Sequence, residues 1–239
     1  NVSGGSGTLS STTRNIVFQI KDLSSTSRNI VFYSYTGSSN RRTNILFAVN
    51  TIHKSIVLGS DDVEDYDTTL YPSDLYLYMA KSGPNGSDNG FRFQKIYMPR
   101  NAVIRSAYII FTPAIAAPRI DDVRFYCEAN DDPNTFTNHA QFIGRTKTVA
   151  NVPWSMPVWA VGAVGTKVNS PDISKCIQEV VDRPGWVPGN DLVVFVYDEA
   201  APGASDRRTA SFEGSLGPKN TARLILVYDV GTKKVQNVI

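Results

Sequence analysis

The chain has 239 residues and a mass of 26.2 kDa, which is long enough for one large β domain or two small ones. Charged residues make up only 19%, against about 25% in an ordinary domain, and the net charge of +2 gives no electrostatic case for nucleic-acid binding. Two cysteines and two histidines exclude a disulfide scaffold and a four-cysteine zinc site, and they leave little material for histidine-based catalysis.

The N-terminal part of the chain carries an imperfect repeat of β-branched and aromatic residues. The three units are Arg14–Phe18, Arg28–Phe32 and Thr43–Phe47, and the stretches between them are rich in Ser, Thr and Gly. Such runs between turn-formers predict short strands. We expect residues 1–53 to form an arm that docks on a neighbouring subunit, although three ordinary strands of the main sandwich are the alternative. The apolar positions of the arm are Ile16, Phe18, Ile30, Phe32, Ile45 and Phe47.

From residue 54 to 229 the sequence predicts a series of strands with turns rich in Gly and Pro. In Phe91–Ile96 and Val123–Cys127 apolar and polar residues alternate, which indicates one buried and one solvated face. A single helix is predicted over Ser170–Asp182, with Pro171 near its start. The predicted fold is therefore all-β, a jelly-roll β-sandwich with one short α-helix, preceded by the arm of short strand repeats and followed by a tail over residues 230–239.

Several blocks within the predicted sandwich carry a family likeness. Asn101–Phe111, preceded by Phe91-Arg92-Phe93 and Met98-Pro99, resembles the signature of bacterial extracellular jelly-roll modules of the DNRLRE type, which are similar to carbohydrate-binding modules. The resemblance covers about residues 55–229 and implies the jelly-roll fold, without fixing an activity. Further blocks of the pattern are Ser60–Asp65, Val152–Trp159, Asp172–Ser174, Gln178–Trp186 and Ala222–Tyr228.

The arm repeats carry a second resemblance. Units of the form Arg-Asn-Ile-Val-Phe, at Arg14–Phe18 and Arg28–Phe32, look like the tandem strand repeats of tailed-phage virion proteins. This resemblance implies a role in an assembly, at the surface of a virion or elsewhere outside a cell.

The densest charge in the chain is acidic and lies between residues 61 and 67. Oxygen-rich clusters of this kind suit Ca²⁺, which takes six to eight oxygen ligands, so calcium is the one cofactor that the sequence suggests. The expected ligands would be Asp61, Asp62, Glu64 and Asp74. The alternative is a solvated turn between two strands, and the EF-hand pattern is absent.

Aromatic residues supply a candidate carbohydrate-binding surface. Sugar-binding sandwiches present exposed flat rings to the apolar faces of pyranoses. Tyr76 and Tyr78 fall on one face of a predicted strand, and Trp154 lies beside two prolines, so these three residues are the expected platform. Trp159 and Trp186 are expected to pack in the core.

The sequence offers no convincing catalytic constellation. It has no G-x-S-x-G elbow, P-loop or dinucleotide-binding fingerprint. Glu64, Glu128, Glu179 and Glu213 are the candidates for a glycosidase pair, but nothing in the sequence brings two of them into one cleft. We therefore expect no catalytic residues. For Cys127 and Cys176 we favour two buried free thiols, and a disulfide between them is the alternative.

Three functions follow from these patterns. The leading hypothesis is a non-enzymatic structural protein of an extracellular assembly, a capsid- or tail-associated phage virion component with a carbohydrate-binding-like jelly roll. The alternatives are a secreted bacterial carbohydrate-binding module and a polysaccharide-degrading enzyme. The expected partners are other copies of the chain, neighbouring virion or surface proteins, and polysaccharide, with no nucleic acid and no membrane span. We also expect residues 54–239 to fold without the arm.

Overall fold

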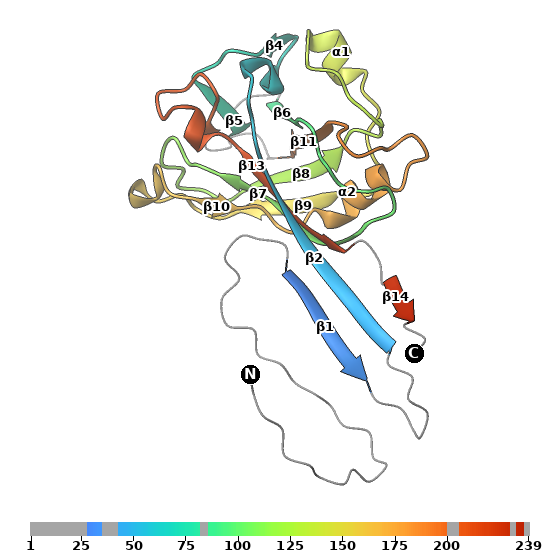
Figure 1. Ribbon diagram of the computed structural model, residues 1–239. Helices are drawn as coiled ribbons and strands as arrows, with labels where there is room; N and C mark the ends of the chain where they lie inside the picture. Colours follow the sequence, from blue (N-terminus) through green and yellow to red (C-terminus); the bar gives the residue numbers. More distant parts are fainter. Residues whose placement is uncertain (1–27, 35–42, 82–85, 200–205, 230–232, 237–239) are drawn as a thin grey trace.

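The computed structural model describes residues 28–34, 43–81, 86–199, 206–229 and 233–236 (Figure 1). It contains two six-stranded antiparallel sheets and one two-stranded sheet, so the all-β prediction is confirmed. The first sheet has the order β1-β2-β13-β7-β10, with β14 also paired to β2. Its strands are β1 (Arg28–Ser34), β2 (Thr43–Ser55), β7 (Val103–Phe111), β10 (Val168–Asn169), β13 (Arg223–Asp229) and β14 (Lys233–Gln236).

The second sheet has the order β4-β3-β6-β11-β8-β9, and the small third sheet pairs β12 with β5. The strands of the second sheet are β3 (Asp62–Tyr66), β4 (Thr69–Tyr71), β6 (Asp88–Phe93), β8 (Asp121–Cys127), β9 (Val152–Met156) and β11 (Leu192–Asp198). The strands of the third sheet are β5 (Tyr76–Ala80) and β12 (Arg207–Ala210). The described residues also form the α-helices α1 (His139–Ile143) and α2 (Ser174–Val181).

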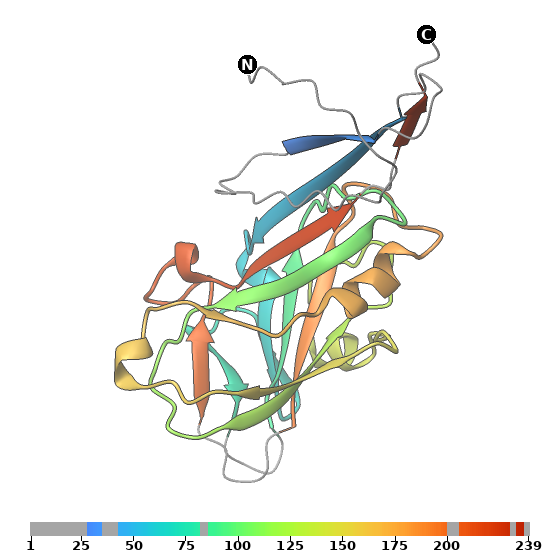
Figure 2. The ribbon, with the colours of Figure 1, turned by 90° about the horizontal axis from the view of Figure 1, so that it is seen from below.

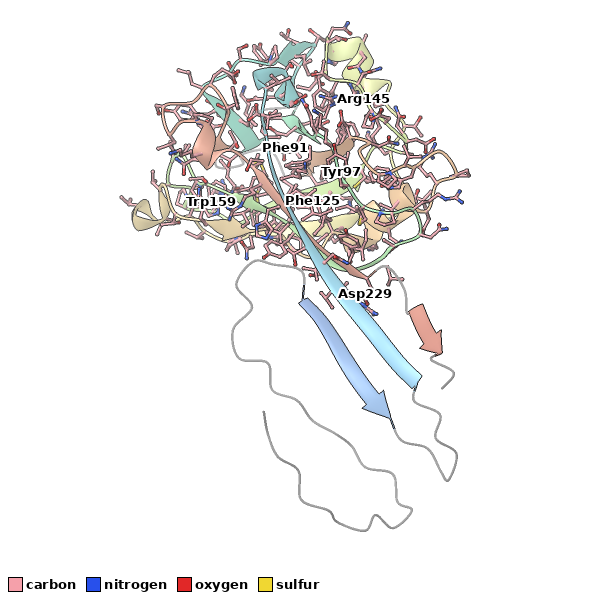
Figure 3. All side chains as sticks on the ribbon, in the orientation of Figure 1. Phe91, Tyr97, Phe125, Arg145, Trp159 and Asp229 are labelled. Carbon is pink, nitrogen blue, oxygen red and sulfur yellow. The ribbon has the colours of Figure 1, made fainter. Side chains whose placement is uncertain are left out.

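The main core lies between the two large sheets. Phe111 of β7 meets Phe91 of β6 edge-on, with ring centroids 5.6 Å apart, and lies 6.4 Å from Phe125 of β8. Figure 3 shows Phe91 and Phe125 near the middle of the body, and both side chains are fully buried. Because alternate residues of each strand point inward, the two sheets bury one apolar face each.

A second apolar cluster covers the outer face of the second sheet. Strand β11 is apolar at nearly every position, which is typical of a strand buried on both faces. Its residues Val193 and Phe195 point away from the main core and pack against Phe136 and Phe142, which belong to the segment that carries α1. Gly90 on β6 permits this contact, since a Cβ there would lie 2.4 Å from Phe136 Cζ.

Helix α2 begins later than the sequence predicts. The helix was expected from Ser170, but residues before Ser174 instead run along the edge of β7. The N–H of Ser170 donates to Ile109 O over 2.8 Å, and Asp172 Oδ1 accepts from the N–H groups of Ala107 and Ser174, each at 2.9 Å. The backbone of β7 therefore competes with the first helical turn for the same hydrogen-bonding groups.

Strand β2 belongs to two parts of the molecule. Its residues 49–55 pair with β13 in the sandwich, and Ile52 packs against the main core. Its residues 43–49 pair with β1, and residues 43–46 also pair with β14, so these strands extend the first sheet beyond the body (Figures 1 and 2). The predicted boundary between residues 53 and 54 therefore falls inside one continuous strand.

Several local predictions differ from the structure. The stretch Asp62–Tyr66, expected in a loop, forms strand β3, and its residues 62–65 are buried. The β-branched stretches Thr146–Val149 and Val158–Val161, whose composition predicts strands, form only isolated bridges, at Lys147 and Trp159. The residues before the second repeated unit, including the predicted arm positions Ile16 and Phe18, lie outside the described part of the chain. Among the described residues, no helix has the length and apolar character needed to cross a membrane.

Candidate functional site

The small sheet of β5 and β12 lies beside β3 and brings together two sets of residues that the sequence singled out. Tyr76 and Tyr78 lie on the outer face of β5, where each is half-buried, while Leu77 and Met79 at the alternate positions are fully buried. The N–H of Tyr78 donates to Glu64 Oε2 over 3.1 Å. A predicted sugar-binding residue therefore contacts a predicted metal ligand.

Asp61 is fully buried and surrounded by protein donors. Arg92 Nη1 lies 2.8 Å from Asp61 Oδ1, and Gln94 Nε2 donates to Oδ2 over 2.6 Å. The hydroxyl of Thr135 donates to Oδ1 over 3.2 Å. Through both of its carboxylate oxygens, Asp61 therefore joins the end of β6 to the segment around Thr135.

Asp62 is buried with only one of its oxygens bonded. Oδ2 accepts a hydrogen bond from the N–H of Phe212 over 2.9 Å, whereas Oδ1 has no hydrogen-bond partner in the described part of the chain. Burial is the main cause that raises the pKa of Asp62 to about 8; the hydrogen bond from Phe212 opposes this shift, and the nearby carboxylates of Glu213 and Asp61 contribute to it. Asp62 therefore holds a proton through most of the neutral pH range.

Glu64 and Asp74 complete the predicted calcium set. Burial raises the pKa of Glu64, whose Oε1 lies 3.5 Å from Lys81 Nζ. The backbone carbonyl of Asp74 accepts from Ser211 Oγ over 2.6 Å. Among the residues that the structure describes, no group of three or more His, Cys, Asp or Glu is placed to hold a metal ion. The four predicted ligands, Asp61, Asp62, Glu64 and Asp74, thus do not form such a group.

Trp154, the third predicted platform residue, lies in a different place. Its ring stacks on Phe111 with centroids 6.0 Å apart and lies 5.8 Å from the ring of Phe125. It is half-buried against the main core and does not extend the surface of Tyr76 and Tyr78. The core placement of Trp159 and Trp186 is confirmed, since each is 1% exposed.

Two cations complete the outer surface of β5. The guanidinium of Arg208, on β12, lies 4.5 Å from the ring centroid of Tyr78 and 5.9 Å from that of Tyr76. Lys81 Nζ lies 4.5 Å from the ring of Tyr78 and 3.4 Å from that of Tyr66. Together Tyr66, Tyr76, Tyr78, Lys81 and Arg208 form an aromatic and cationic surface, which we call the tyrosine–arginine surface. Sequence reasoning missed Arg208 because its partner strand is more than a hundred residues away.

A second polar cluster lies on the outer face of the second sheet. Asp65 and Asp88 are directly opposite on β3 and β6, and Asp65 Oδ1 lies 2.9 Å from Nδ1 of His139. Burial raises the pKa of Asp88 to about 7. Lys147 Nζ lies 3.7 Å from the ring centroid of Tyr197, whose hydroxyl is buried without a partner in the described residues. This cluster joins the α1 segment to the sheet beneath it.

Two of the four glutamates considered for glycoside hydrolysis make separate structural contacts. Glu128 Oε2 pairs with Arg145 Nη1 over 2.6 Å, and Arg145 also donates to the carbonyl of Thr135 (Figure 3 labels Arg145). Glu179 accepts from the N–H groups of Val149 and Ala150, at 2.9 and 2.8 Å. Each of these two carboxylates therefore orders a different loop.

Both cysteines are buried and free, as the sequence favoured. Cys127 lies on β8 and Cys176 on α2, and the thiol of Cys176 donates to Phe125 O at 3.9 Å. Burial raises the pKa of the Cys176 thiol to about 11 and that of Cys127 well above its usual range. Neither thiol has the character of a nucleophile.

No protein-family model matches the chain, and no curated protein matches it. The resemblance to extracellular jelly-roll modules therefore stays a prediction.

Proposed function

We propose that this protein is a non-enzymatic structural protein of an extracellular assembly, a virion component of a phage, built on a jelly-roll sandwich. The observation that carries the proposal is the extension formed by β1, β14 and residues 43–49 of β2, which leaves the sandwich as a continuation of the first sheet (Figure 1). Strand β1 of this extension contains Arg28–Phe32, one of the two repeated units that resemble those of phage virion proteins. Asp229, labelled in Figure 3, marks the end of β13, where the extension leaves the body.

The composition of the extension supports a docking role. The register pairs Ile30 with Phe47 and Phe32 with Ile45, and at the alternate positions it pairs Val31 with Leu46. Apolar residue types thus occupy both sets of alternating positions, one set for each face of the sheet. A sheet with apolar residue types in both sets of positions favours association with another chain, because a partner can cover a face that two or three strands cannot bury alone.

The edge of the extension supports the same role. Strand β1 is the last strand of its sheet in the described part of the chain, and its sequence, Arg28–Ser34, contains no proline and no acidic residue. Natural proteins protect exposed edges with charge, proline or bulges, since an open edge templates pairing with another chain. An edge whose single protection of this kind is the charge of Arg28, at its first position, suits strand addition between subunits.

The test is a pair of truncations that the path of β2 defines. The first removes residues 1–47 and 233–239, which takes away the extension but keeps the part of β2 that pairs with β13. We expect a cooperatively melting monomer, whereas the full chain should form oligomers at micromolar concentration in sedimentation analysis. A full chain that stays monomeric at every concentration would overturn the proposal.

The second truncation, which removes residues 1–53, is the matched control. It strips most of β2 from β13 and deletes Ile52 from the core, so we expect it to melt at a lower temperature than the first variant. Equal stability of the two variants would show that β2 contributes nothing to the sandwich.

A second candidate function is carbohydrate binding, which the side-by-side position of Tyr76 and Tyr78 favours. Both rings are half-buried on the outer face of β5, and polar groups surround them. Aromatic rings beside polar groups are the usual composition of a sugar-binding surface. The two functions are compatible, because the extension and the tyrosine–arginine surface lie on different sheets.

A further inference from the structure

Arg208 lies at the centre of the tyrosine–arginine surface without a counter-ion. It is half-buried and directly opposite Tyr78 in the register of β12 and β5. No residue in the described part of the chain accepts a hydrogen bond from its guanidinium or forms an ion pair with it, and its Nε is buried without a partner. The two tyrosine rings hold its position by cation–π contact.

Other arginines with restricted exposure are neutralised. Arg92 pairs with Asp61, Arg145 with Glu128 at 2.6 Å, and Arg207 with Asp121 at 3.1 Å. Removing a guanidinium from water without an anion is costly, so a chain usually supplies a carboxylate to such a group. Among the described residues, no carboxylate takes that position beside Arg208.

The neighbours of Arg208 define what kind of anion fits. Its planar fork matches a carboxylate in two parallel hydrogen bonds. The half-buried rings of Tyr76 and Tyr78 provide apolar area next to it, which suits the face of a pyranose. Lys81 adds a second positive charge, but Glu64 lies 3.5 Å from it, so of these two cations only Arg208 has no ion pair among the described residues.

We propose that the tyrosine–arginine surface binds an acidic polysaccharide, with the carboxylate of a uronic acid on Arg208 and its sugar ring against Tyr76. This inference deepens the carbohydrate-binding candidate by naming its ligand class and does not depend on the assembly function. It also assigns a role to Arg208, a residue with no sequence motif around it.

Calorimetric titration of the full chain tests the proposal with three polymers: oligogalacturonate, alginate and hyaluronan. Each is used as the free acid and as its methyl ester, which keeps the sugar ring and removes the negative charge. We expect at least one acid form to bind and its ester to bind on the order of ten- to a hundredfold more weakly, as the loss of a charge-assisted hydrogen bond predicts.

Variants distinguish the effect of Arg208 itself from the effect of lowering the net positive charge of the protein. Arg208→Gln should reproduce the loss seen with the ester, whereas Arg223→Gln, which removes an exposed arginine from β13, should leave binding unchanged. Arg208→Lys keeps the charge without the planar fork and should bind with intermediate affinity. If Arg208→Gln fails to fold, the comparison of acid and ester on the unchanged chain still decides.

The outcomes distinguish the proposed acidic ligand class from carbohydrate binding in general. Equal binding of an acid and its ester, lost in Tyr76→Ala, would overturn the role of the carboxylate and keep carbohydrate binding. Absence of binding to all six ligands would overturn the proposed acidic ligand class. Neutral glycans tested on the same sample would then decide whether the carbohydrate-binding candidate survives.

Discussion

Individual acidic residues on β3 and immediately before it are neither solvated nor grouped around a metal site, as their sequence had suggested. Asp61 is neutralised by Arg92, and Glu64 lies beside Lys81, whereas Asp62 relies on one backbone N–H. Burial penalises the charged form of each carboxylate, and the partner decides how much of that penalty is offset. Three residues of one short acidic segment thus have three different electrostatic environments.

Asp62 should make the protein less stable as the pH rises. Its pKa is about 8 in the folded state and 3.8 without the fold, so between these values the folded state binds more protons than the unfolded state. The free energy of unfolding therefore falls from about pH 4 to pH 8. We expect Asp62→Asn to remove this loss and to stabilise the protein at pH 8.5 by on the order of a few kcal/mol.

Urea denaturation at pH 5 and pH 8.5 measures the effect. The variant should gain stability at the higher pH only, because the protonated carboxyl and the amide each leave one buried polar group without a partner. As a control, Asp122→Asn changes an exposed carboxylate on β8 and should not alter the pH dependence. A loss of stability at pH 8.5 in Asp62→Asn would show that the charged form is stabilised in the fold.

At the scale of elements, the segment that carries α1 covers part of the outer face of the second sheet. Phe136 and Phe142 pack on Phe195, and Arg145 ties the segment to Glu128. The sheet accommodates these rings because β6 has a glycine, Gly90, where a side chain would collide with them. The contact joins elements that are far apart in sequence, so alternation within β6 alone does not reveal it.

Gly90→Ala should therefore destabilise the protein. The new Cβ would lie 2.4 Å from Phe136 Cζ and 2.9 Å from Phe142 Cε2, so the rings must move away from β11. Overpacking of this kind costs about 1–3 kcal/mol, which thermal or urea denaturation resolves. Gly162→Ala is the matched control, because a Cβ there meets no atom within 4 Å, and it should change stability little. Equal stability of the two variants would mean that the segment around α1 shifts to accommodate the Cβ without a loss in the free energy of unfolding.

For the molecule as a whole, one core cluster links distant parts of the chain, and we expect the sandwich to unfold as one cooperative unit. Cys127 on β8 and Cys176 on α2 are both fully buried in its main core. Reaching either thiol requires the helix or a sheet to separate from the rest. Thiol reactivity is therefore a measure of global opening.

Both thiols should resist labelling in the native protein and react together on unfolding. Their pKa values are raised by burial, so little thiolate is available at neutral pH even if reagent enters. A thiol-specific reagent at pH 7.5 should label two cysteines with the urea dependence of the unfolding curve. Non-reducing mass spectrometry should find both thiols free, and rapid labelling of one thiol in the absence of urea would contradict a single cooperative core.

Much of the architecture was predictable from local patterns. Alternation in Val123–Cys127 predicts a strand that agrees with β8 within a few residues, because a strand repeats its environment every second residue. The apolar run Leu192–Tyr197 is typical of a strand buried on both faces, as β11 is. The late start of α2 was not predictable in this way. The groups of Ser170 and Asp172 that would begin the helix bind β7 instead, and that choice depends on a strand about sixty residues earlier.

The candidate site shows the same division. The sequence by itself determined that Tyr76 and Tyr78 share one face of a strand, since that follows from their spacing alone. Only the tertiary structure decided that Arg208 lies beside these rings, that Trp154 packs against the core and that Asp62 is buried. Local sequence fixes which residues share a face, but the free energy of burying that face depends on which distant segment covers it, and only long-range pairing establishes that.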